Sequence, residues 1–179
     1  MRIRHFTVDV EADGPCPGLF SMVSFAVVPV DRPEGAFYRT LAPISERWVP
    51  EALAISGFTR EQTLGFDPPA TVLADFRTWA RATLGADRGV LVSDNPGFDL
   101  AFLTYYCTWA GFANPFGHSA RRLGDLCAGL VGDLRATGRW KAWTTTAHTH
   151  NALDDATKMA EGFRAIQARL ALKAPQARA

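Results

Sequence analysis

The sequence of 179 residues has few of the features that mark a specialised class of protein. Its three cysteines, Cys16, Cys107 and Cys127, are far apart and form no Cys-x-x-Cys pair. This excludes a disulfide framework, and we expect reduced thiols in a cytoplasmic protein. With 19 basic and 18 acidic residues, the formal net charge is +1. No overall positive field therefore attracts nucleic acid, and any contact with phosphates must come from a local cluster or from metal ions.

Long hydrophobic runs are also missing. The longest apolar stretch, "LFSMVSFAVVPV", has 12 residues and is too short to cross a bilayer as a helix. The first residues, "MRIRHFTVDVEADG", place acids where a signal peptide needs an apolar core. The length fits one domain with a sizeable core. We expect that domain to cover residues 1 to 172 and residues 173 to 179 to form a disordered tail.

The hydrophobic pattern predicts the order strand-strand-strand-helix-strand-helix, followed by further helices. Residues 4–10, 20–30 and 35–43 read as strands joined by short turns, which is typical of an antiparallel meander. Helical spacing follows at 68–85, a buried strand at 88–94 and an apolar helix at 97–112. Another helix is expected over 121–134, with one short strand before it as an option, and a last helix over 153–172. This order predicts an α/β fold with a mixed sheet flanked by helices.

Two acids interrupt the first strand on alternate positions. Side chains two residues apart point to the same face of a strand, so Asp9 and Glu11 project together. Neighbouring anions repel, and burying them is costly unless a positive charge lies between them. A divalent metal ion meets that need. An isolated Asp-x-Glu is more often a solvated pair at a sheet edge, so the pattern gains weight only from other residues.

Those other residues lie further along the chain. Asp99 falls near the start of the helix after the fourth strand, where capping of that helix is the alternative to metal binding. His150 lies in a loop, and Asp155 follows in the first turn of the last helix. Because no set of Cys and His ligands accompanies these carboxylates, Mg²⁺ or Mn²⁺ suits them better than zinc.

Together these residues form three short motifs that are similar to those of a known family. They are Asp9-x-Glu11 with Gly14, Phe98-Asp99, and His150-x-Ala152-x-x-Asp155. In this order they resemble the exonuclease motifs of the DEDD superfamily, and the last spacing resembles its DEDDh branch, the DnaQ-like 3′-5′ exonucleases. The resemblance covers residues 5 to 165 and implies a ribonuclease H-like fold.

The resemblance also implies an activity. The family's metal ligands map onto Asp9, Glu11, Asp99 and Asp155, which would hold two divalent ions, Mg²⁺ or Mn²⁺, and its general base maps onto His150. Such enzymes release nucleoside 5′-monophosphates from the 3′ end of single-stranded nucleic acid or short oligonucleotides by a two-metal mechanism. We favour RNA slightly over DNA. Relatives that act alone are often dimers, so a homodimer is one option.

The chain departs from the usual family pattern in two places. "DVEADG" replaces the common Asp-Thr-Glu-Thr-x-Gly, and Asp94 stands where many members have a histidine. These departures point to a divergent subgroup, nearer to the small stand-alone exoribonucleases. We interpret the extra acids Asp13, Asp94 and Asp154 as groups outside the ligand set or in solvent. His148 competes with His150 for the role of base, but only His150 has the family spacing.

Two segments are candidates for contacts with the strand. "RATGRWKAW", residues 135–143, combines Arg139 and Lys141 with Trp140, and cations with aromatic rings are typical of surfaces for single-stranded nucleic acid. The alternative is a surface loop whose tryptophans pack back onto the domain. Phe58 in "ISGFTREQ" is a possible stacking residue or a cap for the next helix. Two other functions stay open: a catalytically weak DEDD-like binding module, and a phosphohydrolase of small nucleotides.

Overall fold

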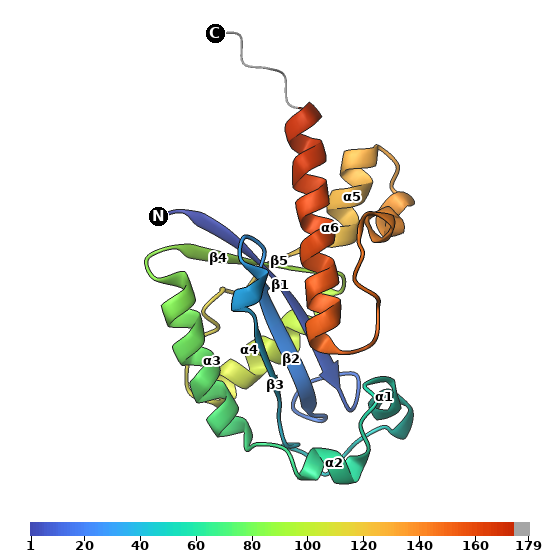
Figure 1. The fold of residues 1–179 in the computed structure, drawn as a ribbon. Coiled ribbons are helices and arrows are strands. Elements are labelled where there is room, and N and C mark those ends of the chain that lie inside the picture. Colours follow the sequence, from blue (N-terminus) through green and yellow to red (C-terminus); the bar gives the residue numbers. More distant parts are fainter. Residues whose placement is uncertain (174–179) are drawn as a thin grey trace.

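A computed structural model describes residues 1–173, and it consists of one mixed sheet with helices on both faces (Figure 1). The strands lie in the order β3-β2-β1-β4-β5. Their bounds are β1 Ile3–Ala12, β2 Met22–Pro29, β3 Phe37–Thr40, β4 Arg88–Ser93 and β5 Ala120–Arg122. The helices are α1 Pro50–Ile55, α2 Arg60–Leu64, α3 Pro69–Leu84, α4 Pro96–Trp109, α5 Leu123–Val131 and α6 Ala152–Lys173, with 3₁₀ helices η1 Pro33–Gly35 and η2 Ala136–Trp143.

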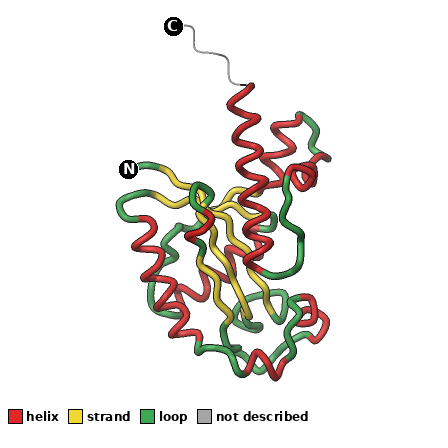
Figure 2. Tube along the Cα trace, in the orientation of Figure 1, coloured by secondary structure: helices red, strands yellow, loops and turns green. Residues whose placement is uncertain are grey.

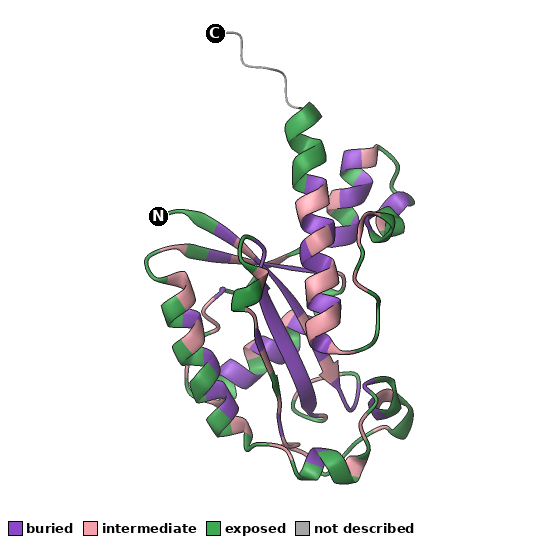
Figure 3. Cartoon of the chain, viewed as in Figure 1, coloured by how far each residue is buried: buried purple, intermediate pink, exposed green. Residues whose placement is uncertain are grey.

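The sheet has the predicted ribonuclease H-like order. Strands β1, β2 and β3 form the antiparallel meander, and β1 pairs in parallel with β4 on its other side. A helix between β3 and β4 provides the crossover that a parallel pair requires. All residues of β2 are buried (Figure 3), which explains its almost continuous apolar sequence. The strand β1 therefore lies in the middle of the sheet.

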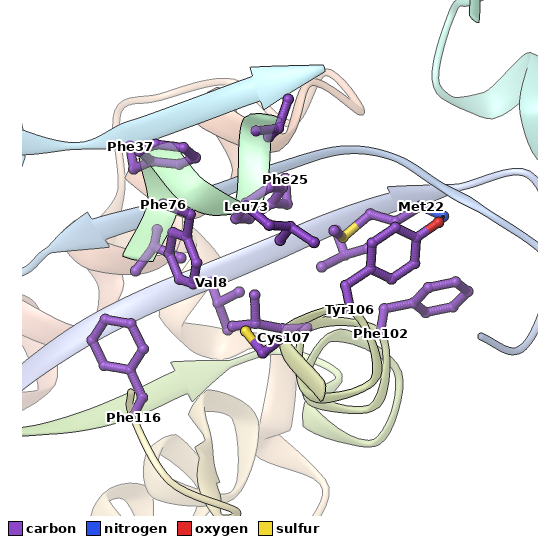
Figure 4. Packing of buried hydrophobic residues seen from close by; sticks show 14 of the residues in the cluster. Val8, Met22, Phe25, Phe37, Leu73, Phe76, Phe102, Tyr106, Cys107 and Phe116 are labelled. Carbon is purple, nitrogen blue, oxygen red and sulfur yellow. Dashed lines mark hydrogen bonds between the residues drawn. The ribbon is translucent and has the colours of Figure 1, made fainter. Parts of the chain in front are cut away.

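The two faces of β1 belong to two different cores. Phe6, Val8 and Val10 point into a core that also contains Phe76 from α3 and Tyr106 from α4 (Figure 4). The intervening residues face the opposite side, where α5, α6 and η2 pack on the sheet. This alternation follows from the two-residue period of a strand. It places the odd-numbered residues of β1 under the last helix.

The elements that the sequence pattern missed are short. Helices α1 and α2 were not expected, and neither were the 3₁₀ helices η1 and η2. The optional short strand is present as β5. Lys173 belongs to α6, so the expected tail is wrong at that residue, and residues 174–179 lie outside the described part of the chain. Within residues 1–173, no helix combines the length and the apolar character needed to cross a membrane.

Candidate active site

The carboxyl end of β1 places Asp9 and Glu11 on the face that α6 covers. Thr7, two residues earlier on this face, donates its hydroxyl to the carbonyl of Ala156 in α6 at 2.7 Å. The parallel pairing of β1 with β4 ends at Thr7 and Val92. β4 ends at Ser93, one residue after that pair, whereas β1 continues to Ala12, so Asp9 and Glu11 lie beyond the paired part of the two strands.

Asp99 reaches this space from the first turn of α4. It is 4% exposed, and its carboxylate accepts hydrogen bonds from the backbone N–H of Val10, at 3.1 Å, and from the hydroxyl of Ser93. The helix begins at Pro96 directly after β4, as the sequence indicated. The Asp99 carboxylate therefore bonds to β1 and to the end of β4. Capping of its own helix, the alternative considered from the sequence, does not account for these two contacts.

Asp155 enters from α6 and also anchors the loop before it. Its two carboxylate oxygens accept hydrogen bonds from the backbone N–H groups of Thr149 and His150, each at 3.1 Å. Nδ1 of His148 lies 2.9 Å from Asp155 Oδ2. His150 has a φ of 57° in the left-handed region, which histidine adopts more readily than most residues. The loop, drawn in green before the last helix in Figure 2, is thus folded around one carboxylate.

The predicted ligands converge in space. Carboxylate oxygens of Asp9, Glu11 and Asp155 lie within 4.8 Å of one another, and Asp155 forms a second such group with the ring nitrogens of His148 and His150. The Asp99 carboxylate stands beside the first group, close enough for its charge to act on Asp9 and Glu11. The sequence motifs therefore assemble at one place, although they come from three separate elements.

The carboxylates at this place are not neutralised by lysine or arginine within residues 1–173, although the His148 ring contacts Asp155. In the described part of the chain, no lysine or arginine nitrogen lies within 4.0 Å of the four acids. Burial and then the neighbouring carboxylates raise the pKa of Asp9 well above its usual range and that of Glu11 to about 8. Burial also raises the pKa of Asp99 to about 7. Such a set of hard oxygen ligands fits a divalent cation such as Mg²⁺ or Mn²⁺.

The raised pKa values predict how stability depends on pH. Without metal, folded Glu11 keeps a proton up to about pH 8, whereas its usual pKa is 4.5. The unfolded chain therefore releases that proton first, and the free energy of unfolding falls as pH rises between these values. We expect the melting temperature in chelator to fall from about pH 5 to about pH 8. The gap between the melting temperatures of the metal-loaded and the metal-free protein should widen over the same range.

Thermal melts with and without Mg²⁺ measure this gap. The control is Glu11→Gln, which removes one titrating carboxyl and should reduce the change of the gap with pH. A gap that stays constant across this range in the unaltered protein would contradict the expectation.

A cavity of about 170 Å³ opens beside the carboxylates, and we call it the lateral cavity. It is lined by residues of β1, η2, α6 and the loops beside them: Asp9, Asp94, Trp140, Lys141, His148, Asp155, Lys158 and Met159. Sequence reasoning did not select Lys158. A signal was available, because Lys158 follows Asp155 by three residues on α6 and residues at that spacing share a helix face.

The segment 135–143 departs from its expected role at one residue. Trp140 is 2% exposed and packs against Gly162 in α6, where a Cβ atom would lie 2.5 Å from its ring. The interpretation of Trp140 as a base-stacking residue is therefore wrong in this structure, because the ring fills the core beneath α6. Lys141 lines the lateral cavity, with its Nζ 3.3 Å from Asp94 Oδ2. Arg139 is exposed outside that cavity.

Phe58 packs on its own part of the chain. Its ring lies edge-to-face against Phe66, with centroids 5.0 Å apart, so the two rings flank α2. The helix itself begins with a capping box, in which Thr59 and Gln62 exchange hydrogen bonds. This arrangement agrees with the structural interpretation of Phe58, and a contact with a nucleotide stays a prediction.

The extra acids have three different environments. Asp13 is fully buried, so it does not lie in solvent, and it stands outside the carboxylate cluster: it accepts hydrogen bonds from Ser21 N at 2.5 Å and Arg60 at 3.0 Å. Asp94 is partly exposed in the lateral cavity. Asp154 accepts a hydrogen bond from the Thr149 hydroxyl at 2.8 Å. Asp13 therefore holds the segments of Ser21 and Arg60 together, and Asp154 holds Thr149 in the loop before α6.

Comparisons with known proteins give one relative in sequence. No protein-family model matches the chain. The chain is 33% identical over 171 residues to the 3′-5′ DNA exonuclease Cap18 of Escherichia coli, and the alignment covers 89% of each protein. At this identity and coverage the two chains share a family.

Solved structures are similar in fold. The nuclease domain of 3′hExo, described as a DEDDh family member bound to rAMP, has a TM-score of 0.71 and 17% identity, with 96% of this chain and 92% of that chain covered. Exonuclease I of E. coli in complex with a dT13 oligonucleotide has a TM-score of 0.67 and 14% identity, with 96% of this chain but 42% of that chain covered.

Proposed function

The chain belongs to the DEDDh 3′-5′ exonucleases, and from that premise we propose that it releases nucleoside 5′-monophosphates from the 3′ end of single-stranded DNA. The convergence of Asp9, Glu11 and Asp155 under α6, with Asp99 beside them, is the observation that carries this proposal. The printed name of the relative in E. coli supports DNA as the substrate. This choice differs from the slight preference for RNA that the sequence alone suggested.

Each residue of the site has a proposed role. Asp9, Glu11, Asp99 and Asp155 hold two divalent ions, Mg²⁺ or Mn²⁺. When bound, such ions stabilise the charge on the attacking and leaving oxygens of a displacement at phosphorus. His150 accepts the proton of the attacking water, as a neutral imidazole can do near pH 7. The protein's own contribution is to fix these groups relative to one another before the strand arrives.

Asp155 links the carboxylates to the proposed base. Its side chain holds the backbone N–H of Thr149 and of His150, so the position of the histidine depends on the same group that is proposed to bind metal. The second histidine, His148, contacts Asp155 directly and its ring centroid lies 4.3 Å from that of His150. We propose that His148 orients this loop and that His150 carries the proton.

Contacts with the rest of the strand are proposed at two cations. Lys141 lines the lateral cavity beside the carboxylates, which supports a contact with phosphate. Arg139 is exposed on the same 3₁₀ helix and is proposed to contact the strand further from the cut. Phe58 is retained as a proposed contact for a base. A purely nucleic-acid-binding role is disfavoured because all five family site residues are present.

Digestion of end-labelled strands tests the proposal. With Mg²⁺ or Mn²⁺, a 5′-labelled single-stranded DNA should shorten from its 3′ end in single-nucleotide steps, and a 3′-labelled strand should release its label as a mononucleotide. Labelled RNA of the same sequence should be cut more slowly, and excess chelator should stop both reactions. Faster cutting of RNA would overturn the choice of DNA, and hydrolysis of free nucleotides alone would favour the phosphohydrolase alternative.

A further inference from the structure

The lateral cavity is lined by acids and by two lysines. Asp9 and Asp155 line it together with Lys141, from η2, and Lys158, from α6. Lys158 Nζ donates a hydrogen bond to the carbonyl oxygen of Thr146 at 2.7 Å. This contact leaves donor capacity on an ammonium group, which has three N–H bonds. Two cations from separate elements therefore reach one small space beside the carboxylates.

The two lysines are not equally neutralised. Lys141 Nζ lies 3.3 Å from Asp94 Oδ2, whereas no carboxylate oxygen of residues 1–173 lies within 4.0 Å of Lys158 Nζ. If Asp9 and Asp155 hold divalent cations, their charges are compensated. The Lys141–Asp94 pair is neutral, so Lys158 gives the remaining lining a positive charge that favours an anion.

The size of the cavity indicates what kind of anion fits. Cavities that enclose a whole drug-sized molecule measure about 300–1,000 Å³, and this one is about 170 Å³. It therefore suits a phosphate group better than a complete nucleotide. Lysine binds phosphate as a compact point charge, and two ammonium groups that line one cavity can share one phosphate.

The position of Lys141 is fixed by its neighbour in η2. The Trp140 ring is buried against Gly162 and holds the 3₁₀ helix on α6. Lys141 Nζ lies 5.5 Å from the centroid of that ring. The tryptophan thus presents the cation toward the cavity, although it does not itself face the solvent.

We propose that Lys158 and Lys141 contact the 5′-phosphate of the terminal nucleotide, which is the phosphate that the proposed reaction attacks, and so form a phosphate subsite beside the proposed metal ligands. Asp94 competes with this phosphate for Lys141. The inference rests on the proposed function and names the part of the substrate that the lateral cavity takes.

Equilibrium binding of dAMP and of deoxyadenosine, both with Mg²⁺ present, tests the subsite. Loss of a charge-assisted contact corresponds to a weakening of about 10-fold to 100-fold. Lys158→Ala should weaken binding of dAMP by this factor and leave deoxyadenosine unchanged, because only dAMP carries the phosphate. Lys173→Ala is the matched control, because Lys173 is also on α6 and donates to a carbonyl, that of Leu130, at 2.7 Å.

Further variants separate a phosphate contact from a role in holding the loop through Thr146. Lys158→Arg should keep most of the affinity for dAMP, whereas Lys158→Gln should lose as much as alanine. Asp94→Asn should tighten dAMP binding, and the gain should disappear in the double variant Asp94→Asn with Lys141→Ala. An equal loss for dAMP and deoxyadenosine in Lys158→Ala would mean that Lys158 only positions the loop, and would overturn the proposal.

The outcomes also distinguish this inference from the proposed reaction. Binding of dAMP requires no turnover. If the protein cut no DNA strand but its affinity for dAMP still depended on Lys158, the subsite would stand and the proposed reaction would be overturned. Normal digestion of DNA with unchanged dAMP affinity in Lys158→Ala would overturn the subsite alone. Absence of measurable dAMP binding to the unaltered protein would also overturn it.

Discussion

Asp155→Asn is expected to abolish release of nucleotides, because it removes one proposed metal ligand and weakens the anchor of the catalytic loop. The carboxylate lies within 4.8 Å of those of Asp9 and Glu11, and it also holds the N–H groups of Thr149 and His150. The rate of digestion of a 5′-labelled strand measures the loss, and circular dichroism checks that the fold is kept.

Two variants separate the causes of this loss. Asp9→Asn removes a ligand without touching the loop, and it should abolish turnover as well. Because it relieves repulsion among buried carboxylates, it should also raise the melting temperature of the metal-free protein. Asp154→Asn is the neighbouring control, since Asp154 bonds only to the Thr149 hydroxyl among the described residues, and it should keep most of the activity. Full activity of Asp155→Asn, or of the unaltered protein in excess chelator, would refute the metal site.

His150→Ala is expected to lower the turnover rate by about 10²–10⁴-fold, the usual contribution of general acid–base catalysis. The backbone of His150 is in the left-handed region, so alanine at this position also strains the loop. His150→Asn removes the imidazole with a residue that tolerates this conformation. A similar loss in both variants would assign the effect to the ring and not to the backbone.

His148→Ala is the comparison for this prediction. His148 contacts Asp155 at 2.9 Å, and its loss should cost far less than the loss of His150. Initial rates under saturating substrate, measured across pH 5 to pH 9 for both variants, show which ring carries the proton. If His148→Ala were the more damaging change, the roles of the two histidines would be exchanged.

The sequence predicted those parts of the site that depend on local periodicity. Asp9 and Glu11 share a face because strand side chains alternate, and the parallel pairing of β1 with β4 brings Asp99 to the same end of the sheet. The order of strands and helices along the chain followed from the hydrophobic pattern, because strands and helices have different periods. The helices α1 and α2 escaped detection because six and five residues are too few to show a helical period.

Other features depend on contacts between distant residues and leave no local pattern. Asp13 was expected outside the ligand set or in solvent, and the sequence did not show that Arg60, 47 positions away, would bind and bury it. Trp140 looked like an exposed aromatic residue in a basic segment, and its burial depends on the absence of a side chain at Gly162 in another helix. These partners become visible only when the elements are packed.

The place of β1 in the sheet has a consequence for partial unfolding. The strand has neighbours on both sides, whereas the loop that carries His148 and His150 is exposed and is held by hydrogen bonds to α6 side chains, among them Asp155, Lys158 and Glu161. Segments with few buried contacts open at a lower free energy than the middle of a sheet. Local opening would therefore release the histidines while Asp9 and Glu11 keep their register, so thermal fluctuation would displace the proposed proton acceptor at a lower free energy than it would separate the two acids of β1.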